Sequence, residues 1–222
     1  MITISTITDF GSYIISQVYP LERQLVFETD YYCSNLKKYK EMEATIETET
    51  VFIGDSLTSN FNLLKYFPEL NAINGGIPGD TSTGLLNRIT PENFEKVKNV
   101  IILIGYNDLK YRKNSYIAEN IKKLASKLYS SHIYIISVLP VAPNRTWFNK
   151  RINNLNSSIY NLCSLPHTTF IDAHAQFIDS QKRIRKDLYT DRTHLNEKGY
   201  AILSKIIKHT LQLEQNLTDN PI

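Results

Sequence analysis

A candidate nucleophile, Ser56, follows the apolar residues Val51 to Ile53 and the pair Gly54-Asp55. An apolar run that ends in glycine and a polar turn is typical of a buried strand. Open α/β sheets bind their ligands at the carboxyl ends of strands. A helix that starts at Ser56 would direct backbone N–H groups toward developing negative charge near the hydroxyl. Gly-Asp-Ser is also a common turn and helix cap, so this stretch alone leaves the function open.

An aspartate and a histidine lie three residues apart near the end of the chain, at Asp191 and His194. A serine hydroxyl is a poor nucleophile until a base removes its proton, and histidine is the usual base. The histidine needs a carboxylate that fixes its tautomer and stabilises the imidazolium. Because a single turn can bring Asp191 and His194 to the same face, we predict that Ser56, His194 and Asp191 are the catalytic residues.

Two further strand ends carry polar, glycine-containing sequences, which start at Gly79 and at Gly105. In a parallel sheet all carboxyl ends lie at one edge, so these groups can converge on Ser56. The predicted oxyanion hole consists of the backbone N–H groups of Ser56 and Gly79 and the side-chain amide of Asn107. Glycine at position 79 would let the backbone approach a substrate without a Cβ in the way.

Other polar residues near these motifs are expected to have structural roles. Asp55 is expected to hydrogen-bond neighbouring loops, and Asp80 and Thr81 are expected to cap a helix. No cluster of His, Cys and carboxylate residues resembles a metal site, so neither a metal nor a cofactor is predicted. The remaining histidines lack partners at ligand spacing and are predicted to lie on the surface or in the core: His132, His167, His174 and His209.

Strand-like and helical patterns alternate along the chain, which predicts right-handed βαβ crossovers. Residues 99–104 include five consecutive branched aliphatics, as expected for a central parallel strand buried on both faces. The predicted fold class is α/β, a three-layer α/β/α arrangement with a five-stranded parallel, flavodoxin-like sheet. Strands are expected near 51–54, 71–74, 99–104, 132–138 and 168–171, and helices near 57–64, 85–89, 117–128, 147–162 and 200–211.

Residues 1–45 precede the first clear strand and are predicted to form a helical N-terminal arm packed on a domain of residues 46–222. Phe10, Ile14 and Val18 have the spacing of one face of a short helix. Pro20 interrupts this pattern, and a second helical stripe continues as far as Tyr39. Binding of a partner through this arm is the alternative.

The composition excludes several classes of protein. The chain has 222 residues, 42% of them hydrophobic, which fits a single globular domain. A net charge of +3 is too small to indicate a nucleic-acid-binding surface. The longest apolar runs have the length of strands, so no transmembrane helix is expected. Two distant cysteines and the lack of a secretory signal favour the cytoplasm.

These motifs together resemble the SGNH (GDSL-type) hydrolase family of esterases and lipases. Gly-Asp-Ser-Leu at 54–57 matches the family's first block, and Gly79 matches the glycine of the second. Gly105-x-Asn107-Asp108 matches the third block, and Asp191-x-x-His194 matches the last. The resemblance covers residues from about 50 to 212 and implies the same roles for Ser56, His194, Asp191, Gly79 and Asn107.

The stretches Gly-Ile-Pro-Gly-Asp-Thr-Ser and His-Leu-Asn-Glu-Lys-Gly-Tyr are similar to the branch that includes the platelet-activating-factor acetylhydrolase catalytic subunits. That similarity implies short acyl groups, such as acetyl, on a lipid or sugar alcohol. Arg192 stands where the family often has glycine, and we expect its side chain to point to solvent rather than to the pocket rim. Trp147 and Phe148 either line an acyl pocket or pack in the core.

The sequence therefore predicts a serine esterase that acts on a small-molecule ester through an acyl-enzyme. An O-acyltransferase with the same three catalytic residues is the first alternative, since a hydroxyl group could replace water as the acceptor. A non-catalytic binding protein on the same fold is the second alternative, although such a protein tends to lose a catalytic residue. The sequence leaves the natural substrate and the oligomeric state open.

Overall fold

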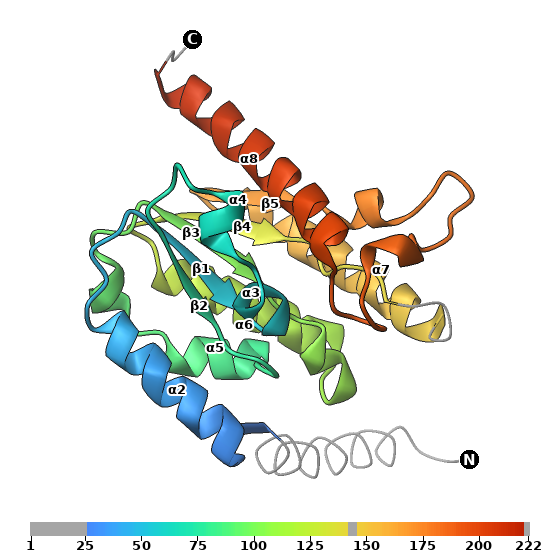
Figure 1. Cartoon of the computed structure of the whole chain (residues 1–222). Helices are drawn as coiled ribbons and strands as arrows, with labels where there is room; N and C mark the ends of the chain where they lie inside the picture. Colours follow the sequence, from blue (N-terminus) through green and yellow to red (C-terminus); the bar gives the residue numbers. More distant parts are fainter. Residues whose placement is uncertain (1–25, 142–145, 220–222) are drawn as a thin grey trace, which may run out of the picture.

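The computed structural model of the protein describes residues 26–141 and 146–219. Five strands form one parallel sheet in the order β2-β1-β3-β4-β5, with helices on both faces (Figure 1). The predicted three-layer α/β/α fold is therefore confirmed. The strands are β1 (Thr50–Gly54), β2 (Ala72–Gly76), β3 (Asn99–Leu103), β4 (His132–Ile136) and β5 (Thr168–Ile171).

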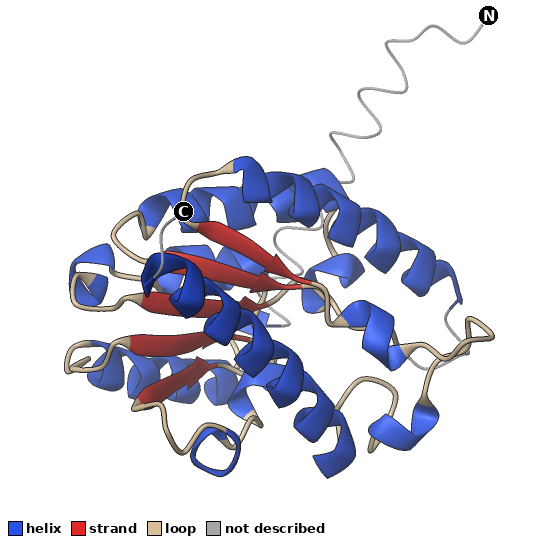
Figure 2. Cartoon of the chain, turned by 90° about the horizontal axis from the view of Figure 1, so that it is seen from above, coloured by secondary structure: helices blue, strands red, loops and turns tan. Residues whose placement is uncertain are grey.

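The helices form two layers with the sheet between them (Figure 2). One face packs against α2 (Asp30–Glu43), α5 (Ser82–Arg88), α6 (Asn114–Lys127) and α7 (Thr146–Tyr160). The other face packs against α3 (Ser56–Ser59), α4 (Leu63–Tyr66) and α8 (Glu197–Asp219). In the described ranges, no helix has a stretch that is long and apolar enough to span a bilayer. The described residues also include short 3₁₀ helices: η2 (Pro91–Phe94), η3 (Asn107–Lys110), η5 (Asn161–Ser164), η6 (His174–Phe177) and η7 (Lys186–Leu188).

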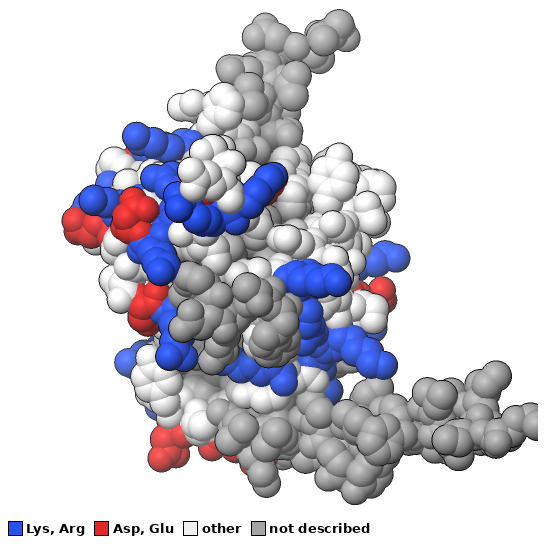
Figure 3. Space-filling model, turned by 90° about the vertical axis from the view of Figure 1, so that its right-hand side faces the viewer, with Lys and Arg blue, Asp and Glu red and all other residues white. Residues whose placement is uncertain are grey.

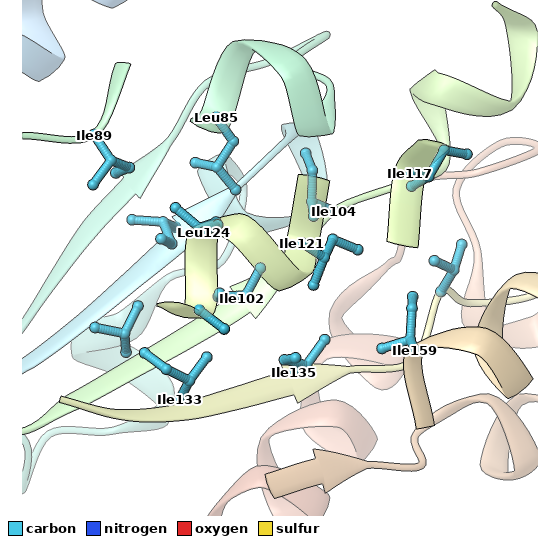
Figure 4. Close-up of a cluster of buried hydrophobic side chains, with 14 of the residues drawn as sticks. Leu85, Ile89, Ile102, Ile104, Ile117, Ile121, Leu124, Ile133, Ile135 and Ile159 are labelled. Atoms are coloured by element: carbon cyan, nitrogen blue, oxygen red, sulfur yellow. The ribbon is translucent and has the colours of Figure 1, made fainter. Parts of the chain in front are cut away.

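The central strand β3 is buried on both of its faces, as its run of aliphatic residues predicts. Val100 and Ile102 pack into the cluster beneath α5, α6 and α7, of which Figure 4 shows a part. Ile101 and Leu103 pack into the cluster beneath α3, α4 and α8. All four are at most 4% exposed. Burial of each such side chain contributes roughly 1.5–3 kcal/mol, so β3 anchors both layers.

The strand order creates a switch point between β1 and β3. Strand β2 lies beside one edge of β1, and the chain then crosses over so that β3 lies beside the other edge of β1. In open α/β sheets the crevice at such a point is the usual ligand site. Ser56 follows β1 and Asn107 follows β3, so both lie at this crevice.

The helix predicted near 57–64 is two separate short helices. Asn62 begins the second one, because its Oδ1 accepts a hydrogen bond of 2.9 Å from the N–H of Lys65 and caps α4. As a result Leu64 leaves the expected apolar stripe and is 82% exposed. The apolar spacing indicated helical structure here but not the cap that divides it.

Helix α2 lies within the predicted N-terminal arm. Its residues Tyr32 and Tyr39 are each 4% exposed and pack into the core beneath α5. The first predicted helix of the arm, with Phe10, Ile14 and Val18, lies outside the described residues. The division into an arm of residues 1–45 and a domain of residues 46–222 stays a prediction.

Candidate active site

The end of β1 brings Ser56 to the carboxyl edge of the sheet. A Cβ added to Gly54 would lie 2.1 Å from the carbonyl oxygen of Leu103, so only glycine lets β1 and β3 converge this closely. Asp55 then caps α3, since its Oδ1 accepts a hydrogen bond of 2.9 Å from the N–H of Leu57. This side-chain contact lies within its own turn, whereas the backbone N–H of Asp55 donates a hydrogen bond of 3.3 Å to the carbonyl oxygen of Leu103 at the end of β3. Among the described residues, the expected hydrogen bonds from Asp55 to neighbouring segments are therefore made by its backbone and not by its carboxylate. Ser56 is the first residue of the helical turn, as the sequence indicates.

Ser56, His194 and Asp191 form a continuous chain of hydrogen bonds. Ser56 Oγ lies 3.0 Å from His194 Nε2, and His194 Nδ1 lies 2.6 Å from Asp191 Oδ2. Asp191 Oδ1 accepts hydrogen bonds from the backbone N–H groups of Thr193, at 2.7 Å, and His194, at 2.8 Å. The N–H of Thr190 donates to the carbonyl oxygen of His194 and closes the turn. The structure thus brings together the three side chains whose types and spacing predict a catalytic role.

The surroundings of Asp191 keep its carboxylate ionised. Partial burial alone would raise the pKa of Asp191, but the hydrogen bonds from His194 and Thr193 outweigh that effect and hold the pKa well below its ordinary value. A carboxylate accepts hydrogen bonds only, so it favours the tautomer of His194 with the proton on Nδ1. Nε2 is then the acceptor that faces Ser56, which is what removal of the hydroxyl proton requires.

Asn107 lies beside the turn that follows β2. Its Nδ2 donates a hydrogen bond of 3.1 Å to the carbonyl oxygen of Asp80, and its Oδ1 accepts one of 3.2 Å from Lys110. The contact with Asp80 uses one of the two N–H bonds of the Asn107 amide. Gly79 has a φ of +82° and open space around its Cβ position. Its backbone conformation, and not crowding by the protein, therefore requires glycine there.

Asp80 is the centre of a buried polar network that joins α2 to the sheet. Its Oδ2 pairs with Nε of Arg88 at 2.8 Å, and its Oδ1 accepts a hydrogen bond of 2.9 Å from Tyr32. Arg88 also donates to the carbonyl oxygens of Gly54 and Gly75, at 3.3 and 2.8 Å. Burial raises the pKa of Asp80, and Arg88 opposes that shift. Loss of one partner would leave a buried charge without compensation, so this network fixes the turn after β2.

The sequence predicts that both Asp80 and Thr81 cap a helix, and the structure corrects half of this prediction. Thr81 is the N-cap residue of α5, and its Oγ1 accepts a hydrogen bond of 3.3 Å from Gly84. Asp80 instead forms the ion pair with Arg88. The spacing of eight residues was a weak signal for that pair, whereas Tyr32 lies 48 residues from Asp80 and no local pattern links the two.

A cavity of about 420 Å³, here called the catalytic cavity, opens at this edge of the sheet. Ser56, His194, Asp191 and Asn107 line it, whereas Gly79 does not. The catalytic cavity thus gathers four of the five residues predicted for the site, and Gly79 lies one residue before the Asp80 carbonyl that Asn107 contacts. The walls are mostly apolar and are formed by Leu57, Leu103, Ile104, Val138, Leu139, Pro140 and Val141.

Two cationic residues, Lys110 and Arg192, also line the catalytic cavity. Arg192 is exposed, as expected for a side chain that points to solvent, and it also lines the catalytic cavity, so it lies at the rim. Phe148 is 4% exposed and packs in the core, with its ring centre 6.0 Å from that of Tyr106, which lines the cavity. Of the two alternatives for Phe148, core packing is therefore correct, and Trp147 has no described side chain.

No other histidine lines the catalytic cavity. His132 Nε2 lies 2.8 Å from the hydroxyl of Thr169, and its ring stacks on Tyr134. His174 is partly buried, and its burial lowers its pKa. Among the described residues, no group of three His, Cys, Asp or Glu side chains could hold a metal ion.

Asp55 should make the stability of the protein depend on pH. Burial raises the pKa of Asp55 to about 7, and the hydrogen bond from Leu57 offsets this only in part. The unfolded chain loses this proton near about pH 4, so the folded state binds the extra proton between about pH 4 and pH 7. This group therefore makes the free energy of unfolding fall as pH rises across that interval. We expect Asp55→Asn to be more stable than wild type at pH 8 by roughly 2–4 kcal/mol and nearly equal at pH 4.

Urea unfolding of both proteins at a series of pH values measures this difference. Asp187→Asn is the matched control, because Asp187 is exposed and its replacement should change stability by less than about 0.5 kcal/mol at either pH. A stability difference between wild type and Asp55→Asn that stays constant from pH 4 to pH 8 would contradict the prediction.

The sequence of this chain is similar to those of known proteins. Residues 52–202 match the model of the GDSL-like lipase/acylhydrolase family. Over 185 residues the chain is 29% identical to the alpha1 subunit of platelet-activating factor acetylhydrolase IB from Rattus norvegicus, and the alignment covers 75% of this chain and 76% of the relative.

Two solved structures are similar in fold. One is described as a platelet activating factor from Streptococcus pneumoniae. It has a TM-score of 0.74 at 24% identity, and the match covers 88% of this chain and 99% of that chain. The other, a GDSL-like lipase from Bacteroides thetaiotaomicron, has a TM-score of 0.69 at 24% identity and covers 81% of this chain and 98% of its own. At such identities the likeness concerns the fold alone.

Proposed function

Because the chain belongs to the GDSL-like lipase/acylhydrolase family of carboxylic-ester hydrolases, we propose that it is a serine esterase that removes short acyl groups from a lipid or carbohydrate alcohol. The observation that carries this proposal is the chain of contacts from Ser56 Oγ to His194 Nε2, at 3.0 Å, and from His194 Nδ1 to Asp191 Oδ2, at 2.6 Å. This arrangement is the one in which a serine hydroxyl becomes nucleophilic.

In the proposed mechanism His194 takes the proton of Ser56 as Oγ attacks the ester carbonyl. Asp191 holds the ring of His194 and stabilises the imidazolium that forms. The N–H groups of Ser56 and Gly79 and the amide of Asn107 stabilise the negative charge on the carbonyl oxygen. His194 then gives its proton to the departing alcohol. Water, with its proton removed by His194, releases the acid from the acyl-enzyme and restores Ser56.

A preference for short acyl groups is supported by two observations. The rat relative is named an acetylhydrolase. The catalytic cavity, at about 420 Å³, is near the lower end of the range of roughly 300–1,000 Å³ for small-molecule sites, and it must hold part of the alcohol as well as the acyl chain. Methylene groups beyond its capacity would have to displace packed side chains or stay in water.

We expect kcat/KM to fall roughly tenfold or more, equivalent to about 1.4 kcal/mol, from p-nitrophenyl acetate to p-nitrophenyl octanoate. Initial rates with a series of p-nitrophenyl esters measure this. Leu139→Ala should shift the preference toward longer chains, because Leu139 is 3% exposed and lines the cavity. A maximum of wild-type kcat/KM at long acyl chains would refute the short-chain proposal. Product analysis with an added acceptor alcohol separates hydrolysis from acyl transfer.

A further inference from the structure

A second, larger cavity lies next to the catalytic cavity. Its volume is about 1,110 Å³, and it lies between the loop of residues 178–187 and the start of α7. The two cavities share Pro140, whose carbonyl oxygen accepts a hydrogen bond of 2.7 Å from Tyr189. The two cavities therefore lie side by side, and we call the second one the basic groove.

The basic groove has an excess of positive charge. Its lining includes Lys150 and four cationic residues of the loop, Lys182, Arg183, Arg185 and Lys186. Only two carboxylates, Asp179 and Asp187, accompany these five cations, which leaves an excess of three. Figure 3 shows Lys and Arg side chains gathered on this face of the molecule, with fewer Asp and Glu.

Each of the two carboxylates is paired with one of the two arginines. Asp179 pairs with Nε of Arg183 at 2.9 Å, and Asp187 lies 3.9 Å from Nη2 of Arg185. Within the described part of the chain, Lys150, Lys182 and Lys186 have no carboxylate within 4.0 Å. Three ammonium groups without counter-charges attract an anion from solution or from a substrate.

The backbone of the loop holds these charges in place. Ile178 and Ile184 form an antiparallel bridge, and Asp179 Oδ1 accepts hydrogen bonds from the N–H groups of Gln181 and Arg183, at 2.9 and 2.8 Å. Lys182, at the tip, has a φ of +63°, a conformation that glycine or asparagine adopts at lower cost. A lysine there costs conformational energy and adds a cation to the groove.

The catalytic cavity itself is close to balanced in charge. Lys110 and Arg192 line it beside two aspartates, Asp55 and Asp191. Asp191 stays ionised, and burial raises the pKa of Asp55 to about 7. The excess of positive charge beside the site therefore comes from the basic groove.

We propose that the basic groove binds an oxyanion, a carboxylate or a phosphate, carried by the alcohol part of the ester, so that the substrates of this protein are anionic esters. This inference rests on the proposed esterase function, because it names the substrate class of the same site. Ammonium groups bind such an oxyanion as point charges, and the guanidinium groups add directed hydrogen bonds.

The test compares the mono-O-acetyl esters of glucose, glucuronic acid and glucose 6-phosphate, which carry no charge, a carboxylate and a phosphate. We expect kcat/KM for at least one anionic ester to exceed that for the neutral ester by roughly tenfold, as three exposed charge contacts would give. The ratio should fall as NaCl is added, because exposed charges are screened. The carboxylate and phosphate arms identify which oxyanion the groove prefers.

The variant Lys182→Asn with Lys186→Gln should reduce this ratio to within about twofold of one, while the melting temperature stays equal or rises because asparagine tolerates the left-handed conformation. The matched control is Lys37→Gln with Lys38→Gln, which removes the same charge from exposed positions of α2, on the opposite side of the molecule (Figure 1). The control should keep the wild-type ratio.

A wild-type ratio near one, or a ratio that the groove variant and the control lower equally, would overturn the groove proposal. Calorimetry with glucose 6-phosphate, which has no carboxylic ester to cleave, distinguishes failure of the groove proposal from failure of the esterase proposal. One outcome is that the protein hydrolyses no acetate ester but binds glucose 6-phosphate, and that the groove variant loses this binding. This outcome would reject the esterase proposal and keep the groove proposal. The opposite outcome is that the protein hydrolyses p-nitrophenyl acetate but neither binds glucose 6-phosphate nor prefers an anionic ester. This outcome would reject the groove proposal and keep the esterase proposal.

Discussion

Replacement of Ser56 by alanine is expected to lower kcat/KM for p-nitrophenyl acetate by roughly 10⁴–10⁶-fold. The side chain is the only part of Ser56 that changes, so the backbone N–H at this position stays in place. The reaction loses its covalent route, and only the donors for the carbonyl oxygen and the binding of the ester remain. Initial rates measure the loss, and mass spectrometry should find a serine-directed phosphonate attached to Ser56 in the wild-type protein.

The contacts of Ser56 also predict how mutations combine. Ser56 and His194 act as one unit, so the double variant Ser56→Ala/His194→Ala should be only slightly less active than Ser56→Ala. Ser59→Ala is the matched control, since Ser59 is a partly exposed serine of the same short helix α3. It should keep near wild-type kcat/KM. Labelling of a different serine, or activity that survives Ser56→Ala, would remove the basis for the proposed mechanism.

Replacement of Asn107 by alanine should lower kcat by roughly 10²–10³-fold, equivalent to about 3–4 kcal/mol, and leave KM little changed. The amide can donate to the carbonyl oxygen most effectively once that oxygen becomes negative, so its loss affects the transition state more than the bound ester. The backbone donors at Ser56 and Gly79 stay in this variant. The measurement is kcat per active site, titrated on the same preparation that gives the melting temperature.

The contacts of Asn107 give this experiment a clear alternative outcome. Its Nδ2 donates to the carbonyl oxygen of Asp80, so the residue could serve only to hold the turn after β2. Asn107→Ala would then lower the melting temperature and leave kcat per active site close to wild type. Asn120→Ala is the matched control, because Asn120 is also buried and donates to Ser82 and Thr83 from α6 without lining the catalytic cavity. It should lose stability and keep kcat.

Local sequence determined the strands and one pair of residues of the candidate site. The apolar runs that end at Gly54 and at Leu103 become strands buried on both faces, because a parallel sheet covered by helices leaves no face for polar residues. Asp191 and His194 are three residues apart, and one turn is enough to pair them. Patterns of this kind depend on neighbours along the chain, which is why the sequence predicted them.

The meeting of Ser56 with His194 was predicted from topology, since all carboxyl ends of a parallel sheet share one edge. Their contact spans 138 residues, and its distance of 3.0 Å depends on how β1 and the turn before α8 pack. The split of the helix expected near 57–64 was missed, because one side-chain cap at Asn62 overrides an apolar spacing.

Only the tertiary structure decided what surrounds the site. Tyr32 of α2 donates to Asp80, 48 residues later, and through the carbonyl group of Asp80 this contact reaches Asn107. The position of Arg192 at the rim of the catalytic cavity, and the basic groove beside Pro140, likewise depend on which segments pack side by side. Residue types and short spacings do not encode these contacts, because burial and long-range packing arise only when the whole sheet and its helices assemble.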